Sequence, residues 1–308
     1  MRIAIIGAGM AGLACATELR RQGHDPLLFD KARGPGGRMS TRRMATPLGG
    51  VSFDHGAQYL TARDPDFVAQ VQDWAKEGHV ARWPAAGPDA WVGTPAMNAP
   101  IRAMAADADV TWNSRIEALS HDGRWHLHGD GIDAGTFDAV MLAVPAEQVS
   151  HLIEPHDPHM AEQARSIHSD PCWTVMATFA DRLPIAEDRL TDRGLLASAI
   201  RNSAKPGRSG PEAWVLQATA DWSRDHLEDD PATVLQAILA AFAAEADVPL
   251  PAPVATGIHR WRYAKSRTLG GDALWNADRR LGLCGDWLIA PRIEAAWLSG
   301  RRLAALIG

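Results

Sequence analysis

The first thirty residues constrain the fold more than any other stretch of this chain. Arg2 to Ile6 is a short, almost continuous apolar run, typical of a parallel strand that is covered on both faces. A helical pattern follows from Met10 to Gln22, and a second apolar run, Pro26 to Phe29, ends at Asp30. This order predicts a strand, turn, helix and strand that open a dinucleotide-binding fold, with Asp30 placed to accept the hydroxyls of a ribose.

Three glycines follow the first strand and extend into the start of the helix in the spacing GxGxxG. Gly7 would make the tight turn, Gly9 would let the backbone approach a pyrophosphate, and Gly12 would let the helix pack against the sheet. The N–H groups at the start of the helix would face the phosphates. We therefore expect cofactor contacts from Gly7, Ala8, Gly9, Ala11 and Gly12.

Composition excludes several other classes of function. The 308 residues carry a formal charge of −6, which argues against a protein that coats nucleic acid. The three cysteines lie far apart and form no CxxC pair, so neither a disulfide framework nor a metal site is expected. No apolar run approaches the roughly 18 to 20 residues that span a bilayer, and the first strand leaves no room for a signal peptide, so we expect no membrane association and a cytoplasmic location.

A second glycine-rich stretch follows Asp30. It contains Lys31, the pair Gly36 and Gly37, and then Arg38. Glycines bring the backbone close to a phosphate, and a guanidinium can bond two of its oxygens at once. The position of this stretch, directly after the acidic residue, favours a phosphate contact over a flexible basic loop.

These motifs carry a family resemblance. GAGMAG and RGPGGRMSTRR together resemble the flavoprotein superfamily of amine oxidases and their relatives. Within that superfamily the chain is similar to the bacterial renalase group at four further stretches, namely FDHGAQYLTARDPDF, RNSAKPGR, HRWRYA and CGDWLIAPRIEAAWLSG. The resemblance runs from end to end of the chain.

The resemblance implies FAD, bound non-covalently, as the cofactor. It places the 55–57 segment close to the flavin ring, a backbone contact to adenine at one position, and the final Gly-Asp and helix near the ribityl chain and the flavin pyrimidine. Through the resemblance and the motifs together, the further expected cofactor contacts are Asp30, Lys31, Gly36, Gly37, Arg38, His55, Gly56, Ala57, Ile116, Gly285, Asp286, Ile293 and Glu294.

The predicted fold class is α/β, with a discontinuous Rossmann-like FAD-binding domain and a second α+β substrate domain built on an antiparallel sheet. We assign residues 1–52, 97–148 and 256–308 to the first domain, and 53–96 and 149–255 to the second. Helices are expected at 66–76, 231–246 and 293–306. Strands are expected at 110–112, 115–119, 125–128, 137–144, 173–179, 194–200, 214–219 and 281–284.

Substrate choice depends on Arg292. In the amine oxidase relatives a tyrosine stands two positions before the helix glutamate, here Glu294, and forms half of an aromatic cage for the amine. A guanidinium disfavours an ammonium group and suits a phosphate or carboxylate. The loop that holds Arg201, Lys205 and Arg208 is open to two interpretations, a solvated basic turn or an electropositive lip for an anion. The candidate substrate contacts are Gln58, Tyr59, Arg201, Trp261, Arg292 and Trp297.

The renalase resemblance implies an oxidase that converts 2- or 6-dihydro isomers of NAD(P) to NAD(P)+. Hydride would pass to flavin N5, O2 would be reduced to H2O2, and the flavin would carry the chemistry, so no catalytic side chain is assigned. Two alternatives stay open. One is a flavin oxidase or desaturase that acts on an amine or a hydrocarbon, and the other is an FAD-binding protein without turnover.

Overall fold

The computed structural model describes residues 1–246 and 249–307, and these form two compact units. Unit 1 comprises Met1–Gly37, Ile101–Ser169 and the chain from Ser266 onward, and unit 2 comprises Arg38–Pro100 and Asp170–Lys265. Both units are discontinuous in sequence. Over the described residues, none of the helices combines the length and the apolar character needed to cross a membrane.

Unit 1 is built on a mostly parallel sheet with the strand order β18-β19-β12-β1-β2-β8, in which only β18 runs antiparallel to its neighbour. Its central strands are short and apolar, and β12 is buried along its whole length. This pattern confirms the predicted Rossmann-like core. The strands are β1 (Arg2–Ile6), β2 (Asp25–Phe29), β8 (Asp109–Thr111), β12 (Ala139–Leu142), β18 (Leu274–Asn276) and β19 (Leu281–Leu283).

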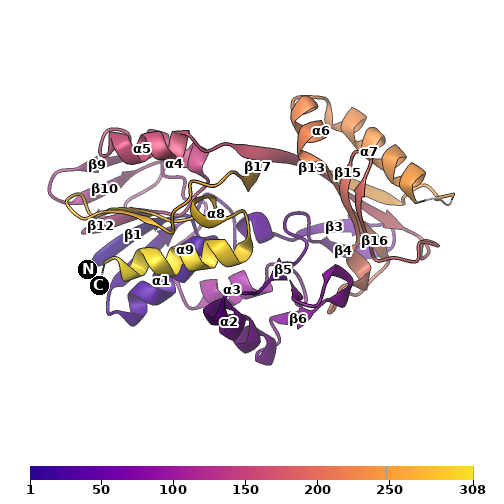
Figure 1. Ribbon diagram of the computed structural model, residues 1–308, viewed down its shortest axis with the longest axis horizontal. Helices are drawn as coiled ribbons and strands as arrows, with labels where there is room; N and C mark the ends of the chain where they lie inside the picture. Colours follow the sequence, from indigo (N-terminus) through magenta and orange to yellow (C-terminus); the bar gives the residue numbers. More distant parts are fainter. Residues whose placement is uncertain (247–248, 308) are drawn as a thin grey trace. The chain divides into compact units, whose positions relative to one another are not determined.

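Helices cover both faces of this sheet, so unit 1 has three layers (Figure 1). The helices α1 and α9 lie side by side on one face, where a Cβ at Gly300 would be 2.1 Å from the carbonyl oxygen of Ala11. Only glycine allows two helices to approach so closely at this point. The helices of the unit are α1 (Met10–Arg21), α3 (Ala99–Ala106, which begins in unit 2), α4 (Ala146–Ile153), α5 (Pro158–Arg165), α8 (Asp286–Ile289) and α9 (Ile293–Ala305).

A small antiparallel sheet, β11-β10-β9, joins the same core as α4 and α5. Its strands are β9 (Ala118–His121), β10 (Trp125–His128) and β11 (Thr136–Phe137). Two predicted strands therefore shift. The strand expected at 115–119 starts later because pairing with β10 begins at Ala118, opposite His128. The strand expected at 137–144 is divided between two sheets at Asp138, whose carboxylate accepts a bond from the Arg2 N–H.

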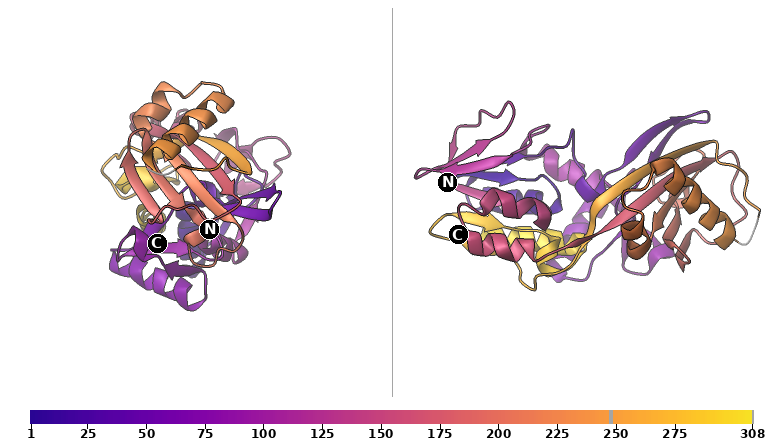
Figure 2. Two further views of the ribbon diagram at one scale, coloured as in Figure 1. Left: turned by 90° about the vertical axis from the view of Figure 1, so that its right-hand side faces the viewer. Right: turned by 90° about the horizontal axis from the view of Figure 1, so that it is seen from above.

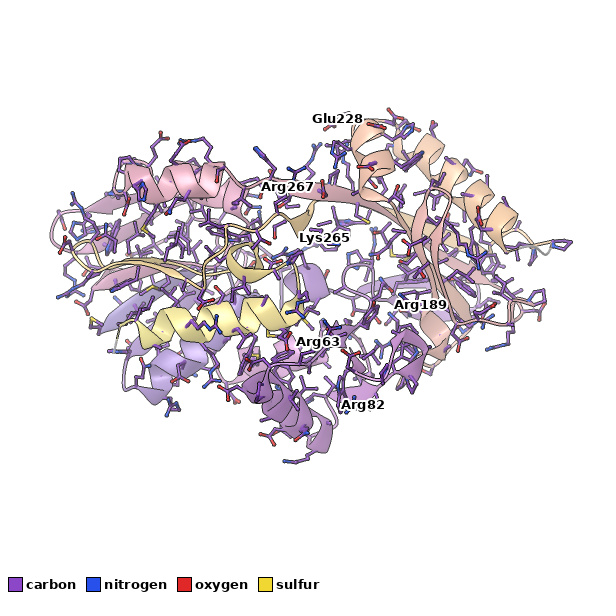
Figure 3. All side chains as sticks on the ribbon, in the orientation of Figure 1. Arg63, Arg82, Arg189, Glu228, Lys265 and Arg267 are labelled. Carbon is purple, nitrogen blue, oxygen red and sulfur yellow. The ribbon has the colours of Figure 1, made fainter. Side chains whose placement is uncertain are left out.

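Unit 2 contains the predicted antiparallel sheet, with the strand order β14-β15-β16-β13-β17. One face is apolar and is covered by α6 and α7, as the two views in Figure 2 show. Glu228, between these helices, bonds Arg260 and Arg262 of β17 (Figure 3). The elements are β13 (Ser169–Phe179), β14 (Arg189–Arg193), β15 (Leu196–Arg201), η3 (Asn202–Ala204), β16 (Glu212–Ala218), α6 (Ala220–Asp225), α7 (Pro231–Glu245) and β17 (Ala255–Ser266).

The opposite face of this sheet packs against a hairpin of β3 and β4, where Val51 and Phe53 meet Met176 and Val215. A further small sheet, β5-β7-β6, completes unit 2 together with α2. These elements are η1 (Gly37–Met39, which begins at the end of unit 1), β3 (Arg42–Thr46), β4 (Gly49–Phe53), β5 (Leu60–Thr61), α2 (Pro65–Lys76), β6 (Val80–Arg82), η2 (Pro84–Ala86) and β7 (Ala90–Gly93).

The boundaries of the units differ from the predicted domains in four places, and local contacts explain each one. Residues 97–100 belong to unit 2, where the Met97 N–H donates to Asp54 Oδ1. Residues 38–52 belong to unit 2 because the β3–β4 hairpin shares the core of its sheet. Residues 149–169 belong to unit 1 because α4 and α5 pack on its sheet. The 256–265 stretch belongs to unit 2 because β17 forms the edge strand beside β13.

Candidate cofactor and substrate residues

The glycine loop of unit 1 has the backbone geometry that its sequence predicts. Gly7 has a φ of 105°, and a Cβ there would lie 2.6 Å from the carbonyl oxygen of Ala143. A Cβ at Gly12 would lie 2.0 Å from the carbonyl oxygen of Gly7. Both positions therefore exclude any side chain, because backbone atoms already occupy the space.

Gly9 differs from its two neighbours in the motif. No described atom lies within 4 Å of a Cβ built on Gly9, although this residue caps the N-terminus of α1. Gly9 has no side-chain oxygen to satisfy the first N–H groups of the helix, and the first turn contains no acidic residue. The open space and the helix N–H groups fit the pyrophosphate of a dinucleotide.

Asp30 is held in place by backbone N–H groups. Its two carboxylate oxygens accept bonds from Ala8 and Ala32, each at 2.8 Å. Each oxygen keeps a second lone pair, so the carboxylate can still accept ribose hydroxyls. Lys31 next to it bonds Gln148 Oε1 at 2.9 Å, and burial together with the charge of Arg115 lowers its pKa.

The second glycine pair and the adenine position lie in the same unit. Gly37 has a φ of 51°, and a Cβ there would lie 3.9 Å from the Cα of Gly9, which brings the two glycine-rich stretches together. Gly36 precedes it with a φ of 154°. Ile116 is buried in the core that also contains Phe29. Their contacts to a cofactor remain predictions.

The C-terminal Gly-Asp is fixed by α9. The N–H of Gly285 donates to Ser299 Oγ at 3.0 Å, and a Cβ at Gly285 would lie 2.6 Å from Trp287 Nε1. Asp286 is buried and begins α8, and Ile293 begins α9. The predicted contacts of Gly285, Asp286 and Ile293 with the ribityl chain and the pyrimidine would therefore come from a segment that is hydrogen-bonded to α9.

Arg292 and Glu294 form an ion pair at the start of α9. Arg292 Nη1 lies 3.1 Å from Glu294 Oε2, and the side chains are 40% and 2% exposed, respectively. The buried carboxylate therefore holds a guanidinium that is itself partly exposed. This arrangement suits an anionic ligand better than an ammonium group.

The substitution Gly9→Ala is expected to weaken cofactor binding without unfolding the protein. The extra methyl group fits the apo structure, but it occupies the space that a pyrophosphate needs. We expect the dissociation constant of FAD to rise about tenfold or more, which corresponds to roughly 1.4 kcal/mol. Fluorescence titration of the apoprotein with FAD measures this effect.

The matched control for that substitution is Gly271→Ala, which also adds a methyl group in open space of unit 1. It should leave the affinity for FAD unchanged. Equal affinities of the Gly9→Ala and wild-type proteins would show that Gly9 does not face the pyrophosphate.

Asp54 is the centre of a buried charge network in unit 2. Its Oδ1 accepts bonds from Thr41 Oγ1 at 3.0 Å and from the Met97 N–H at 2.9 Å. Its Oδ2 faces both Lys205 Nζ, at 3.1 Å, and the guanidinium of Arg208. Burial alone would raise the pKa of Asp54, but the two cations outweigh burial and hold this pKa at about 2.

Lys205 and Gln58 extend this network. Burial lowers the pKa of Lys205 to about 8, against the opposing effect of the Asp54 carboxylate. Lys205 Nζ donates to Gln58 Oε1 at 3.0 Å, while Gln58 Nε2 donates to the carbonyl oxygens of Asp54 and Gly56. Gln58 thus stabilises the loop that contains it. Its contact with substrate remains a prediction.

Arg201 does not lie on a surface lip or a solvated turn, so both sequence interpretations of this residue are wrong. Its side chain is 0% exposed. It pairs with Glu212 at 2.9 Å and with Asp188, and it donates to the carbonyl oxygens of Leu183 and Ile185. The burial of Arg201 and the protein acceptors for four of its five N–H groups leave no path for an anionic ligand, so it is a structural residue.

The 55–57 segment lies against an aromatic cluster. The rings of His55, His259 and Trp261 pack together with centroids 4.4 to 5.1 Å apart, and Trp261 Nε1 donates to the carbonyl oxygen of His55 at 2.8 Å. Burial, with smaller effects from the charges of His259 and Arg42, lowers the pKa of His55 to about 4. His55 is therefore neutral near pH 7.

Gly56 lies between the backbone of Arg38 and the ring of Trp261, all in unit 2. A Cβ at this position would lie 2.1 Å from the carbonyl oxygen of Arg38 and 3.3 Å from Trp261 Cζ2. The adjacent Ala57 N–H donates to that same Arg38 oxygen at 2.8 Å. These contacts couple the positions of three residues that the sequence assigns to the cofactor.

The two remaining substrate candidates differ in exposure. Tyr59 is half-buried, with its ring 6.1 Å from that of Trp83 and 5.8 Å from the guanidinium of Arg189, which is labelled in Figure 3. Trp297 is 4% exposed on α9 and carries Arg301 over its ring. Trp297 thus packs as a core residue of unit 1.

The sequence patterns did not predict two of the contacts around the candidate site residues. One is the pairing of Asp54 with Lys205 and Arg208, which are about 150 positions further along the chain. The other is Gln217 of β16, whose Nε2 donates to the carbonyl oxygen of Gly56 at 2.8 Å. The only sequence signal for Gln217 is a polar residue directly after the apolar run 213–216 of its strand.

Comparisons with known proteins agree with this architecture. The family model described as an NAD(P)-binding Rossmann-like domain matches residues 5–74, and the model described as a flavin containing amine oxidoreductase matches residues 75–308. Renalase of Mus musculus is 26% identical over 86% of this chain and 85% of its own length.

Solved structures share the fold at low sequence identity. A protein from Exiguobacterium sp. described as a protoporphyrinogen oxidase has a TM-score of 0.79 at 14% identity, covering 99% of this chain and 98% of its own. Cyclohexylamine oxidase from Brevibacterium oxydans has a TM-score of 0.70 at 13% identity, with the same coverage of both chains.

Proposed function

Because this chain belongs to the flavin containing amine oxidoreductase family, we propose that it oxidises 2- and 6-dihydro isomers of NAD(P) to NAD(P)+ and reduces O2 to H2O2. The protein is an FAD-dependent oxidoreductase, and non-covalent binding of the cofactor is typical of the family. When bound, FAD accepts a hydride from the donor at N5 and passes the two electrons to O2.

The observation that carries the proposal is the ion pair at the start of α9. Arg292 stands where an amine oxidase would need an uncharged aromatic wall, and Glu294 holds its guanidinium in place. The guanidinium offers N–H donors to the pyrophosphate or phosphate groups of a dinucleotide, and it has no acceptor for the N–H groups of a protonated amine. The similarity to renalase along 86% of the chain supports the same substrate class.

The side chains of this protein need only bind and orient such a donor. A dihydropyridine gains aromaticity as its hydride leaves, so no strong general base is required, and orientation supplies much of the rate. Arg292 would hold the anionic part. Trp261 and Tyr59 of unit 2 are half-buried and stay candidates, by sequence, for stacking with the pyridine.

Anaerobic stopped-flow absorbance tests the proposal. The FAD-loaded protein is mixed in turn with 6-dihydroNAD, β-NADH and a panel of primary amines. We expect rapid bleaching of the flavin by the 6-dihydro isomer, much slower bleaching by β-NADH and none by amines, with H2O2 released once air is admitted. Bleaching by an amine, or by none of these donors, would overturn the proposal.

The substitution Arg292→Ala tests the role of the ion pair. Loss of a charge-assisted hydrogen bond of about 1.5 to 3 kcal/mol should raise the dissociation constant of the dinucleotide roughly 10- to 100-fold. The concentration dependence of the bleaching rate gives this constant. Arg302→Ala, on the same helix, removes only the exposed pair with Asp272 and should leave it unchanged.

A further inference from the structure

A row of polar side chains crosses one face of the main sheet of unit 2. Ser198 of β15 and Thr174 of β13 both lie directly opposite Gln217 of β16. Residues that are directly opposite in neighbouring strands point to the same face of a sheet. The three side chains therefore form a continuous row at one level of the sheet.

The next level of the same face is apolar. Val215 and Met176 lie there, opposite each other and packed against the β3–β4 hairpin. A polar side chain beside such a core is costly unless it is hydrogen-bonded. The row marks the line where the apolar core of this face ends.

The amide of Gln217 is oriented but not saturated. Its Nε2 donates to the carbonyl oxygen of Gly56 at 2.8 Å, and its Oε1 lies 3.4 Å from the hydroxyl of Ser198. Within the described residues, these two contacts use one of the two N–H groups on Nε2 and one of the two lone pairs on Oε1. Gln217 is half-buried, so part of this residue is exposed to solvent.

The glycine that accepts this bond also faces an aromatic ring. Gly56 has the ring of Trp261 on the side where a side chain would lie, since a Cβ built on Gly56 would be 3.3 Å from Trp261 Cζ2. Trp261 is itself fixed by its bond to the carbonyl oxygen of His55. A flat apolar surface and an oriented primary amide therefore meet at one glycine.

We propose that Gln217 is a specificity-determining residue that recognises the carboxamide of a nicotinamide ring. A primary amide matches a second primary amide, because the free N–H of Gln217 can donate to the carboxamide oxygen while Oε1 accepts from the carboxamide NH2. Ser198 keeps the amide from rotating, and Trp261 offers its ring to the pyridine. This inference rests on the proposed function, since it names the part of that substrate which the sheet recognises.

Two oxidised dinucleotides that differ in one group test the inference. NAD+ carries the carboxamide, and 3-acetylpyridine adenine dinucleotide carries an acetyl group without the N–H donor. The dissociation constant of each is measured with the FAD-loaded protein from the change in flavin absorbance. We expect the wild-type protein to favour NAD+ by roughly five- to 20-fold, because the analogue leaves the second lone pair of Gln217 Oε1 without a donor.

Variants separate recognition from a structural role. Gln217→Met keeps the length of the side chain but cannot form the amide pair, so the ratio of the two constants should fall to about one. Ser198→Ala should lower the ratio in part by freeing the amide. Gln72→Met makes the same change on the exposed face of α2 and should keep the wild-type ratio.

The possible results are distinct. A ratio of one in the wild-type protein, or an unchanged ratio in Gln217→Met, overturns the inference even if 6-dihydroNAD bleaches the flavin. Weaker binding of both dinucleotides by the same factor in Gln217→Met also overturns it, since that is the result of a purely structural tie to Gly56. Failure of every dihydro isomer to bleach the flavin would instead overturn the proposed function.

Discussion

Replacement of Asp54 by asparagine is expected to destabilise the FAD-loaded protein by about 3 to 5 kcal/mol, the usual cost of breaking a buried ion pair from one side. Asparagine keeps an oxygen for Thr41 and Met97 but removes the negative charge. Lys205 and Arg208, which are 0% and 4% exposed, are then left without the carboxylate that balances them. Thermal unfolding, followed by circular dichroism, should show a midpoint lower by about 10 °C.

A second substitution shows whether the unbalanced charge is the cause. Lys205→Met in the Asp54→Asn background removes one buried cation, so the double variant should unfold at a higher temperature than Asp54→Asn alone. Asp73→Asn is the control, because Asp73 forms only an exposed pair with Lys76 and should shift the midpoint very little. If Lys205→Met lowers the midpoint further, the network is held by packing and not by charge balance.

Gly56→Ala is expected to displace the backbone of the 55–57 segment. The new Cβ would lie 2.1 Å from the carbonyl oxygen of Arg38, and backbone cannot move aside as a flexible side chain can. Overpacking of this kind costs about 1 to 3 kcal/mol, and we expect the upper end of that range. Because Arg38 and His55 to Ala57 are predicted to contact the cofactor, the FAD content of the purified protein should fall below half.

FAD content and the unfolding midpoint are both measured for this variant. Gly50→Ala in β4 serves as the control, since no described atom lies within 4 Å of a Cβ at Gly50. Full FAD content in Gly56→Ala, with a wild-type midpoint, would show that the segment tolerates a side chain and is not fixed against Arg38.

The local patterns of the sequence predicted the elements of unit 1 well. Apolar runs and the glycine spacing placed β1, α1 and β2, because a buried parallel strand and a phosphate-binding turn each require a narrow set of residues. In unit 2, the helix expected at 66–76 is likewise confirmed as α2, with Asp64 as its N-cap. The FAD cofactor and the oxidoreductase class also followed from these motifs, and the family matches agree with them.

Local patterns failed to predict the burial of charged residues whose ion-pair partners lie in other elements. Arg201 and Lys205 have a sequence context of small and polar residues, which indicates a loop in solvent. Their burial depends on Glu212 and on Asp54, which other segments bring to them. No local pattern encodes such a pairing.

By itself, the sequence determined what each short segment must do: which stretches form strands, where the backbone needs glycine, and which cofactor class the N-terminal loop suits. These properties depend on φ and ψ preferences and on the burial pattern of neighbouring residues. Only the tertiary structure decided that Arg201 is a core residue and that Gln58 bonds the backbone of its own loop. The same holds for Gly56, which accepts a bond from Gln217 and faces the ring of Trp261. Those outcomes depend on strand register and on side-chain hydrogen bonds between distant segments, and these are fixed only when the whole sheet assembles.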